Sequence, residues 1–342
     1  MAERLEPIDG PAVWRGTELA ERTDWIRSLE ASEADELRAE GRRLAELDLD
    51  VSTATAGDAP LPGLADLVAW TDAQLRTGSG AVLLRGVPVQ DEPDVVSAGM
   101  FLALGLHLGA PMHQNAQGDL ICHVRDTGRT YDDPTARAYQ VPDGLPFHSD
   151  ASDVVALLCL RTAKVGGLSR IVSTATLHNE VLARRPDLAP LLYGPWHFDR
   201  RGEEGGYDAP YYTSPICSRV DDVFSMTFGP GIIRSAQRHE ATPRLTPGQI
   251  ELLALMDEIV EEPGMSYDMD LEPGDVQLLL NYSVVHSRTH YQDWEDPARK
   301  RHLLRLWLRQ PTPRPVAPGF GRHFVIPQAE PLARLSELAA LR

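Results

Sequence analysis

Hydrophobic residues recur at helical spacing in the first part of the chain. Leu37, Leu44 and Leu47 lie near such spacing. Ser32 followed by Asp35 resembles a capping box that would begin this helix. A Gly-Ser-Gly turn predicts the end of the next helix. The elements expected up to residue 108 are helices over 34–47, 64–75 and about 93–108 and a buried strand over 81–89.

From about residue 119 onward, short strand-like runs alternate with turns, several of them Pro-Gly or Gly-Gly. Two helices interrupt the series, one near 177–184 and one that begins at Thr246, where Gln249 completes a capping box. This pattern favours a mainly β fold, a sandwich or jelly roll with flanking helices. The chain lacks the regular strand–helix alternation of a doubly wound nucleotide-binding fold. The strand-like runs are 120–126, 154–163, 168–174, 222–229, 275–288 and 301–310.

The organisation of the chain is that of one domain. Its 342 residues contain no repeat, low-complexity tract or obvious linker, so we expect a single domain over 1–342. Residues 1–80 are expected to form a mostly helical flank, and 313–342 a tail and helix. The amphipathic segment 331–342 could pack on its own chain or on a partner subunit, which leaves a homo-oligomer open.

Charge and cysteine content narrow the classes of partner. The chain carries 33 basic and 50 acidic residues, a net charge of −17, which disfavours nucleic acid and anionic membranes as partners. The longest uncharged stretch is interrupted by proline and polar residues, so no membrane span is expected. The N-terminus lacks a signal-peptide pattern, and three cysteines outside any CxxC motif favour a reducing, cytoplasmic setting.

The first candidate for chemistry is the segment Phe-His-Ser-Asp at 147–150. In an extended segment, residues two apart point to the same side, so His148 and Asp150 would converge. An imidazole and a carboxylate placed in this way make a natural pair of metal ligands. Taken alone, the pair equally fits an ordinary polar loop.

A second candidate is His286, near the end of a strongly apolar strand. Strand alternation places Tyr282, His286 and Arg288 on one face, and we expect Tyr282 and Arg288 to line a pocket. Taken alone, His286 also fits a core histidine that is hydrogen-bonded to a neighbour.

The third candidate is a pair of arginines on the last strand. Arg301 and Arg305 share a strand face with Leu303 and Trp307. Guanidinium groups on an apolar strand are costly to bury unless they meet anions, and arginine binds carboxylates in a bidentate manner. Structural salt bridges are the alternative, because the chain has 50 acidic residues.

The order of these residues along the chain is more specific than any one of them. A His-x-Asp pair, a long gap and a later His make up the 2-His-1-carboxylate facial triad, which leaves positions open and suits non-haem Fe(II) and oxygen chemistry. His148, Asp150 and His286 appear in that order, and Arg301 follows. The sequence lacks GxSxG, HExxH and P-loop motifs, which disfavours those hydrolases and NTPases.

Four segments together resemble the Fe(II)/2-oxoglutarate dioxygenases of the taurine dioxygenase (TauD/TfdA) type: FHSD (147–150), GGLSRIVS (166–173), HSRTHYQD (286–293) and RHLLRLWL (301–308). The resemblance covers roughly 80–312 and implies a double-stranded β-helix. It implies iron ligation by His148, Asp150 and His286, and binding of 2-oxoglutarate by Arg301, Arg305 and Ser169, where Ser169 replaces the usual Thr. The separation of His286 and Arg301 is longer than is usual in the family.

The resemblance also implies an activity. With Fe(II), 2-oxoglutarate and O2 would be converted to succinate and CO2 while an unactivated C–H bond of a small polar metabolite is hydroxylated. The expected substrate is an amino acid or another carboxylate, such as a metabolite of natural-product biosynthesis. Desaturation, cyclisation or oxidative cleavage at the same iron site remain open. So do a non-catalytic jelly-roll protein that binds metal or ligand and a zinc hydrolase that uses the same ligands.

Two further polar segments are candidates for substrate contact. Gln114 and Asn115 follow a predicted helix and could reach the substrate, or simply form a turn. Arg200 and Arg201 lie in a charged, glycine-rich stretch that could form a lid and bind a substrate anion, or be a solvated loop.

Overall fold

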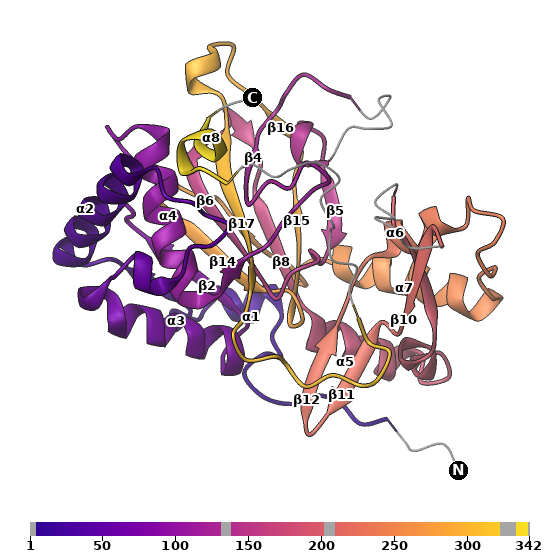
Figure 1. Ribbon diagram of the computed structural model, residues 1–342. Helices are drawn as coiled ribbons and strands as arrows, with labels where there is room; N and C mark the ends of the chain where they lie inside the picture. Colours follow the sequence, from indigo (N-terminus) through magenta and orange to yellow (C-terminus); the bar gives the residue numbers. More distant parts are fainter. Residues whose placement is uncertain (1–4, 131–137, 202–208, 322–332, 341–342) are drawn as a thin grey trace.

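The computed structural model describes residues 5–130, 138–201, 209–321 and 333–340 (Figure 1). The α-helices are α1 (Gly16–Ala20), α2 (Ala31–Leu47), α3 (Ala65–Thr77), α4 (Asp94–Leu108), α5 (Thr174–Arg184), α6 (Pro230–Ala236), α7 (Pro247–Glu261) and α8 (Leu335–Ala339). The strands are β1 (Ile26–Ser28), β2 (Ala81–Arg85), β3 (Ala110–Pro111), β4 (Ile121–Val124), β5 (Leu145–His148), β6 (Val154–Arg161), β7 (Val165–Gly166), β8 (Ser169–Ser173), β9 (Trp196–Asp199), β10 (Tyr211–Ser214), β11 (Cys217–Val220), β12 (Val223–Met226), β13 (Tyr267–Met269), β14 (Val276–Leu280), β15 (Val284–Arg288), β16 (Tyr291–Gln292) and β17 (His302–Arg309).

Two sheets form the centre of the molecule. The larger has the strand order β1-β2-β14-β6-β17-β3, with β4 also paired to β17, and the smaller has the order β13-β8-β15-β5. All pairings in them are antiparallel except β1 with β2. Neighbours in each sheet are distant in sequence, as in a jelly roll. The expected class, mainly β with flanking helices, is confirmed.

Strand alternation divides the core into layers. Ile171 of β8 and Val284 of β15 belong to a cluster that they share with Val155 and Leu303 of the larger sheet, so this cluster lies between the sheets. Val172, next to Ile171, points the other way and packs with residues of α5 and α7. The space between the sheets is therefore where inward-facing polar residues of β15 and β17 meet.

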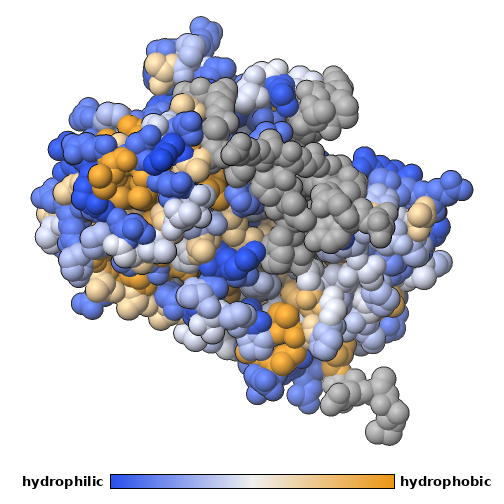
Figure 2. Space-filling view, in the orientation of Figure 1, coloured by the Kyte–Doolittle hydropathy of each residue, from blue (hydrophilic) through white to orange (hydrophobic). Residues whose placement is uncertain are grey.

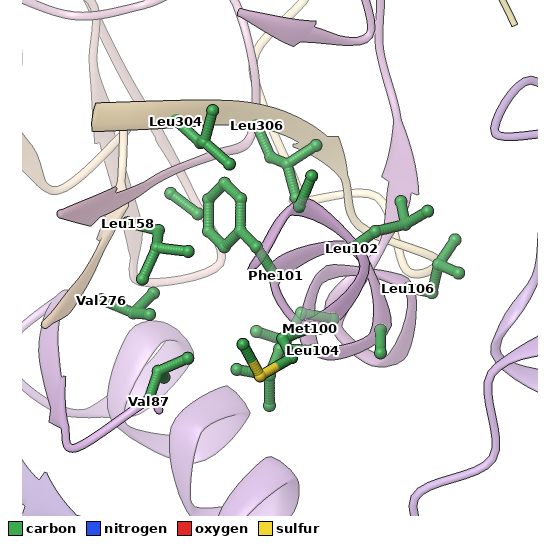
Figure 3. Packing of buried hydrophobic residues seen from close by; sticks show 14 of the residues in the cluster. Val87, Met100, Phe101, Leu102, Leu104, Leu106, Leu158, Val276, Leu304 and Leu306 are labelled. Atoms are coloured by element: carbon green, nitrogen blue, oxygen red, sulfur yellow. The ribbon is translucent and has the colours of Figure 1, made fainter. Parts of the chain in front are cut away.

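The outer face of the larger sheet is covered by α2, α3 and α4. Figure 3 shows Phe101 of α4 among Leu158 of β6 and Leu304 and Leu306 of β17, all buried. Helix α4 is hydrophobic on nearly every side because α2 covers its other face. A Cβ atom at Gly99 would lie 2.7 Å from the carbonyl oxygen of Gly41, so this close crossing requires small residues.

The second half of the chain covers the smaller sheet. Hairpins β9–β10 and β11–β12 and helices α5 and α7 surround a cluster that includes Trp196 and Phe198. Thr246 accepts a hydrogen bond from the backbone of Gln249, so the predicted capping box of α7 is confirmed.

Several local predictions were wrong. Helix α2 begins at Ala31, and its capping box is formed by Glu30 and Glu33 rather than by Ser32 and Asp35. Glu30 can take the capping position because acidic side chains also accept hydrogen bonds from the first backbone amides. Ser32 therefore lies within the first turn of the helix. The flank expected to be mostly helical contains α1, α2 and α3 in its described part, and Ile26–Ser28 adds β1 at the edge of the larger sheet.

Two further predictions, one on a strand and one on a helix face, were wrong. The run 275–288 is two strands, β14 in the larger sheet and β15 in the smaller, separated by a turn. Leu47, predicted with the apolar face of α2, is 58% exposed, whereas Leu37 and Leu44 are fully buried. The predicted C-terminal helix is present as α8, and residues 331–332 and 341–342 lie outside the described residues.

The surface agrees with the charge-rich composition. The face shown in Figure 2 is largely hydrophilic, with hydrophobic residues in small separate groups. Among the described residues, the exposed large hydrophobic side chains are Leu47, Val165 and Ile250, from distant parts of the sequence. Within the described ranges, every helix is too short or too polar to cross a bilayer.

Candidate metal centre and active site

Two neighbouring strands bring the predicted triad together. His148 ends β5, and His286 lies in the middle of β15, directly opposite His148 in the strand register. Asp150 follows β5 by two residues. One ligand atom of each residue lies within 4.8 Å of those of the other two. His148 and His286, 138 positions apart in the sequence, thus converge because β5 and β15 pair.

The ring nitrogens of the triad face the carboxylate. Nε2 of His148 lies 3.6 Å from Oδ1 of Asp150, and Nε2 of His286 lies 3.7 Å from Oδ2. Nδ1 of His148 donates to the carbonyl oxygen of Pro146 at 2.9 Å, which leaves the lone pair on Nε2 for a ligand. Among the described residues, Nδ1 of His286 has no hydrogen-bond partner.

Burial and neighbouring charges together set the protonation states of Asp150 and His286. Burial acts to raise the pKa of Asp150, but Arg305 and the two histidines outweigh it and lower that pKa. Burial, His148 and Arg305 lower the pKa of His286 to about 3, against the opposing charge of Asp150. An ionised carboxylate beside a neutral imidazole is the state that a divalent metal needs. Two nitrogens and one carboxylate fit Fe(II), with room left for other ligands.

Two residues outside the prediction hold Asp150 in place. The side-chain oxygen of Asn281 accepts a hydrogen bond from the backbone of Asp150 at 3.1 Å, and its amide nitrogen donates to Ser152. The indole Nε1 of Trp307 donates to Oδ2 of Asp150 at 2.9 Å. Trp307 shares a strand face with Arg305, which was the signal available in the sequence.

A cavity with an empty volume of about 500 Å³ opens beside the triad. Its walls come from both sheets, so it lies between them. Its lining residues include His148 and His286, the arginines Arg288, Arg301 and Arg305, and Ser169, Tyr139 and Leu145.

Arg301 and Arg288 place two positive charges in this cavity. Both guanidinium groups lie over the ring of Tyr291, at 5.1 and 4.9 Å from its centroid. Burial and the nearby charge of Arg288 lower the pKa of Arg301 to about 10. Within the described residues, Nη1 of Arg301 is buried without a hydrogen-bond partner. Such a group is suited to an anionic ligand.

Arg305 is held between two side chains. Its Nε donates to Oε1 of Gln114 at 2.7 Å, and its Nη1 lies 3.6 Å from Oδ2 of Asp150. Burial acts to lower the pKa of Arg305, but Asp150, Cys122 and Tyr139 outweigh it and raise that pKa. Gln114, predicted to reach the substrate, is buried, and its amide nitrogen donates to two backbone carbonyls.

Three other predicted residues form contacts within the protein. Ser169 lines the cavity, and its hydroxyl donates to Gln277 at 3.0 Å. Asn115 accepts from two backbone amides of its own loop and donates to Asp119. Tyr282 lies in the turn before β15, where its hydroxyl donates to Asp153. Asn115 and Tyr282 are not among the residues that line the cavity.

The charged stretch predicted as a lid is partly described. Arg200 is buried, with its guanidinium 5.5 Å from the ring of Tyr212. Arg201 is exposed, and its backbone donates to the buried carboxylate of Asp199. Neither arginine lines the cavity, and residues 202–208 lie outside the described residues.

Comparison with known proteins extends this geometry. Residues 45–307 match the family model described as taurine catabolism dioxygenase TauD, TfdA family. The chain belongs to the TauD/TfdA family. It is therefore a non-haem iron dioxygenase that uses 2-oxoglutarate, as the resemblance implied. The described His-Asp-His cluster provides a suitable iron site.

The chain is also similar to a named enzyme and to solved oxygenase structures. FR-33289 synthase of Streptomyces rubellomurinus is 34% identical over 330 residues, which cover 94% of this chain and 96% of the relative. A structure of asparagine oxygenase with Fe(II), 2S,3S-3-hydroxyasparagine and succinate matches with a TM-score of 0.63 at 18% identity. It covers 83% of this chain and 93% of that one.

A second solved structure has a similar fold. The non-haem iron oxygenase OrfP with Fe and α-ketoglutaric acid matches with a TM-score of 0.61 at 17% identity, covering 83% of this chain and 94% of that one. At these identities the two structures show the fold of TauD/TfdA-like oxygenases, in agreement with the two-sheet arrangement described above.

Proposed function

We propose that this oxygenase hydroxylates an unactivated C–H bond of a small polar metabolite, an amino acid or another carboxylate, in the biosynthesis of a natural product. The observation that carries the proposal is the His148–Asp150–His286 cluster beside a cavity that also contains Arg288, Arg301 and Arg305. Three guanidinium groups in the cavity, beside a site suited to a divalent cation, favour small anionic ligands.

In this proposal, His148, Asp150 and His286 hold Fe(II). When bound, the iron together with 2-oxoglutarate and O2 supplies the oxidation that replaces C–H by C–OH and yields succinate and CO2. The chain contributes a buried, pre-oriented donor set. The Pro146 carbonyl fixes the tautomer of His148, and Trp307 and Asn281 fix Asp150.

Arg301 and Ser169 are assigned to the distal carboxylate of 2-oxoglutarate. Nη1 of Arg301 is available for a carboxylate oxygen, and the hydroxyl of Ser169 can exchange its bond to Gln277 for one to the same group. Arg305, four residues further, faces the metal end of the cavity through Asp150.

The substrate class is supported by relatives and by charge. The related proteins include a synthase, an asparagine oxygenase and an oxygenase solved with (3S)-hydroxy-L-Arg. Among the substrate-contact residues predicted from the sequence, Arg288 lines the cavity. We therefore assign Arg288 to a negatively charged group of the substrate. Substrate contacts by Gln114, Asn115, Tyr282, Arg200 and Arg201 stay predictions.

Turnover with a defined panel tests this function. The protein is incubated with Fe(II), 2-oxoglutarate and O2 and with amino acids and small carboxylates, and succinate and products are measured by mass spectrometry. Hydroxylation predicts succinate and a product one oxygen heavier. Loss of two hydrogens would indicate desaturation or cyclisation. Absence of iron-dependent succinate formation, or O2-independent turnover with Zn(II), would contradict the proposal.

The setting of the enzyme completes the proposal. All three cysteines are free and buried, which agrees with a reducing compartment such as the cytoplasm. We retain a homo-oligomer as an open proposal and expect neither nucleic acid nor membrane as a partner.

A further inference from the structure

The two carboxylate oxygens of Asp150 have different neighbours. Oδ2 accepts a hydrogen bond from Nε1 of Trp307 at 2.9 Å, and Nη1 of Arg305 lies 3.6 Å from the same oxygen. Oδ1 lies 3.6 Å from Nε2 of His148 and Oδ2 lies 3.7 Å from Nε2 of His286, so each oxygen faces one histidine of the triad. The donors supplied by β17 are therefore concentrated on Oδ2.

The indole of Trp307 is itself fixed. Trp307 is buried on β17, where its carbonyl oxygen accepts from the backbone of Met112 at 2.8 Å. The guanidinium of Arg305 lies 5.0 Å from the centroid of the indole ring. Gln114 holds that guanidinium from its other side through the bond to Nε. Trp307 can therefore act as a rigid donor rather than an adaptable one.

We propose that Trp307 is a positioning residue that holds Oδ2 of Asp150 away from the metal, so that Asp150 ligates through Oδ1 alone. The inference rests on the proposed role of His148, Asp150 and His286 as iron ligands. A facial triad works because it leaves three positions open, two for the keto acid and one for oxygen. A carboxylate that ligated through both oxygens would occupy one of these positions.

Arg305 and Gln114 support the same arrangement. Gln114 is saturated, because Oε1 accepts from Arg305 and the amide nitrogen donates to the carbonyls of Leu120 and Arg305. It holds the guanidinium beside Oδ2 and does not belong to the residues that line the cavity.

The test compares two tryptophans in the full chain. Trp307→Phe removes the indole donor and keeps an aromatic ring. The control is Trp196→Phe, because Trp196 is also buried and its indole donates to a backbone carbonyl at 2.8 Å, but it belongs to the cluster around α5 and α7. Co(II) alone is the probe, since its visible spectrum reports coordination number as well as affinity. Thermal unfolding of the metal-free variants is measured in parallel.

We expect Trp307→Phe to weaken Co(II) binding by roughly 10–100-fold and to change the visible spectrum, while Trp196→Phe leaves both as in the wild type. Co(II) affinity and spectrum unchanged in Trp307→Phe would overturn the inference. So would equal losses in both variants, which would indicate general destabilisation.

The same titration separates this inference from the proposed function. Wild-type binding of Co(II) that disappears in His286→Ala supports the triad. If the wild type shows no His286-dependent binding, the proposed function fails and the role of Trp307 fails with it. If that binding is present and Trp307→Phe matches the wild type, the role of Trp307 alone fails.

Discussion

Within the described ranges, two pairs of histidine rings lie in contact, and their surroundings differ. The rings of His148 and His286 have centroids 4.3 Å apart, and those of His123 and His302 are 5.0 Å apart. Both pairs join β15 or β17 to a neighbouring strand. Only the first pair has a carboxylate between its ring nitrogens and a cavity beside it.

The second pair is closed by protein groups. Nη2 of Arg161 donates to Nδ1 of His302, Nε2 of His302 donates to Nδ1 of His123, and Nε2 of His123 donates to the carbonyl of Leu338, each at 2.8 Å. This direction of donation requires both rings to be neutral. It connects α8 to β4, β17 and β6, and leaves no nitrogen of the pair for a metal.

The difference teaches which histidines form a site. Proximity is common to both pairs, and burial lowers the pKa of His286 and of His302 to about 3 in each case. Asp94 also lies 3.8 Å from Nδ1 of His302, so the distinguishing features are a carboxylate that faces both rings of a pair and lone pairs that converge on one point. A low pKa alone therefore does not identify a ligand.

Loss of a triad residue should have the largest effect. His148→Ala or Asp150→Ala is expected to abolish turnover. Loss of a residue that only supports a metal ligand lowers metal affinity or activity roughly 10–100-fold, and loss of the ligand itself should lower them further. The fold should remain, as checked by circular dichroism. Turnover unchanged in either variant would remove that residue from the triad.

Arg301→Ala should have the next largest effect. It is expected to raise the KM for 2-oxoglutarate about 100-fold or more, because a buried carboxylate would lose its partner, while iron affinity changes little. The control is Arg299→Ala, since Arg299 is exposed and stacks on Trp294. An unchanged KM in Arg301→Ala would place the co-substrate carboxylate elsewhere.

The His123–His302 pair should contribute to the stability of the fold and not to catalysis. His302→Phe leaves the Arg161 donor and Nδ1 of His123 without their partner, which is expected to cost about 2 kcal/mol in the free energy of unfolding. Urea denaturation measures this, with His290→Phe as control because His290 is 61% exposed. Metal affinity should stay unchanged. A large loss of metal binding in His302→Phe would break the distinction between the pairs.

The pH dependence gives the smallest and most specific difference. The fold lowers the pKa of His302 to about 3, chiefly by burial and the neighbouring His123, whereas an unfolded histidine titrates near 6.5. Below about pH 6.5 the unfolded chain therefore binds more protons, and stability falls as pH falls.

The slope of stability against pH measures this effect in urea titrations at pH 5 and 6. It should be shallower in His302→Phe than in the wild type, by up to about 1.4 kcal/mol per pH unit. Equal slopes would show that His302 is not kept neutral by the fold.

The sequence predicted the elements that depend on local pattern. The strands at 301–310 and 168–174 and the capped helix α7 follow from alternation and capping, and all three are present. Asn281 illustrates what local pattern misses: it lies in the turn that separates β14 from β15 and so shifts Tyr282 away from the His286 face. Such turns depend on contacts made across the fold.

The same limit applies to the site. The order of His148, Asp150 and His286 predicted their convergence, because the spacing of metal ligands is visible in sequence. The roles of Gln114 and Trp307 were not visible in the sequence. Each depends on how β17 lies against a residue distant in sequence, 191 positions away for the Gln114–Arg305 bond and 157 for the Trp307–Asp150 bond. Alternation placed Trp307 on the right face but not against Asp150.

The most direct test is the visible charge-transfer band that Fe(II) and 2-oxoglutarate form on the protein without oxygen. It is measured in the wild type, in His286→Ala and in His302→Phe, with folding checked for each. The account predicts the band in the wild type and in His302→Phe, and its loss in His286→Ala. A band that persists in His286→Ala, or is absent from folded wild-type protein, would contradict the assignment of the iron and co-substrate site.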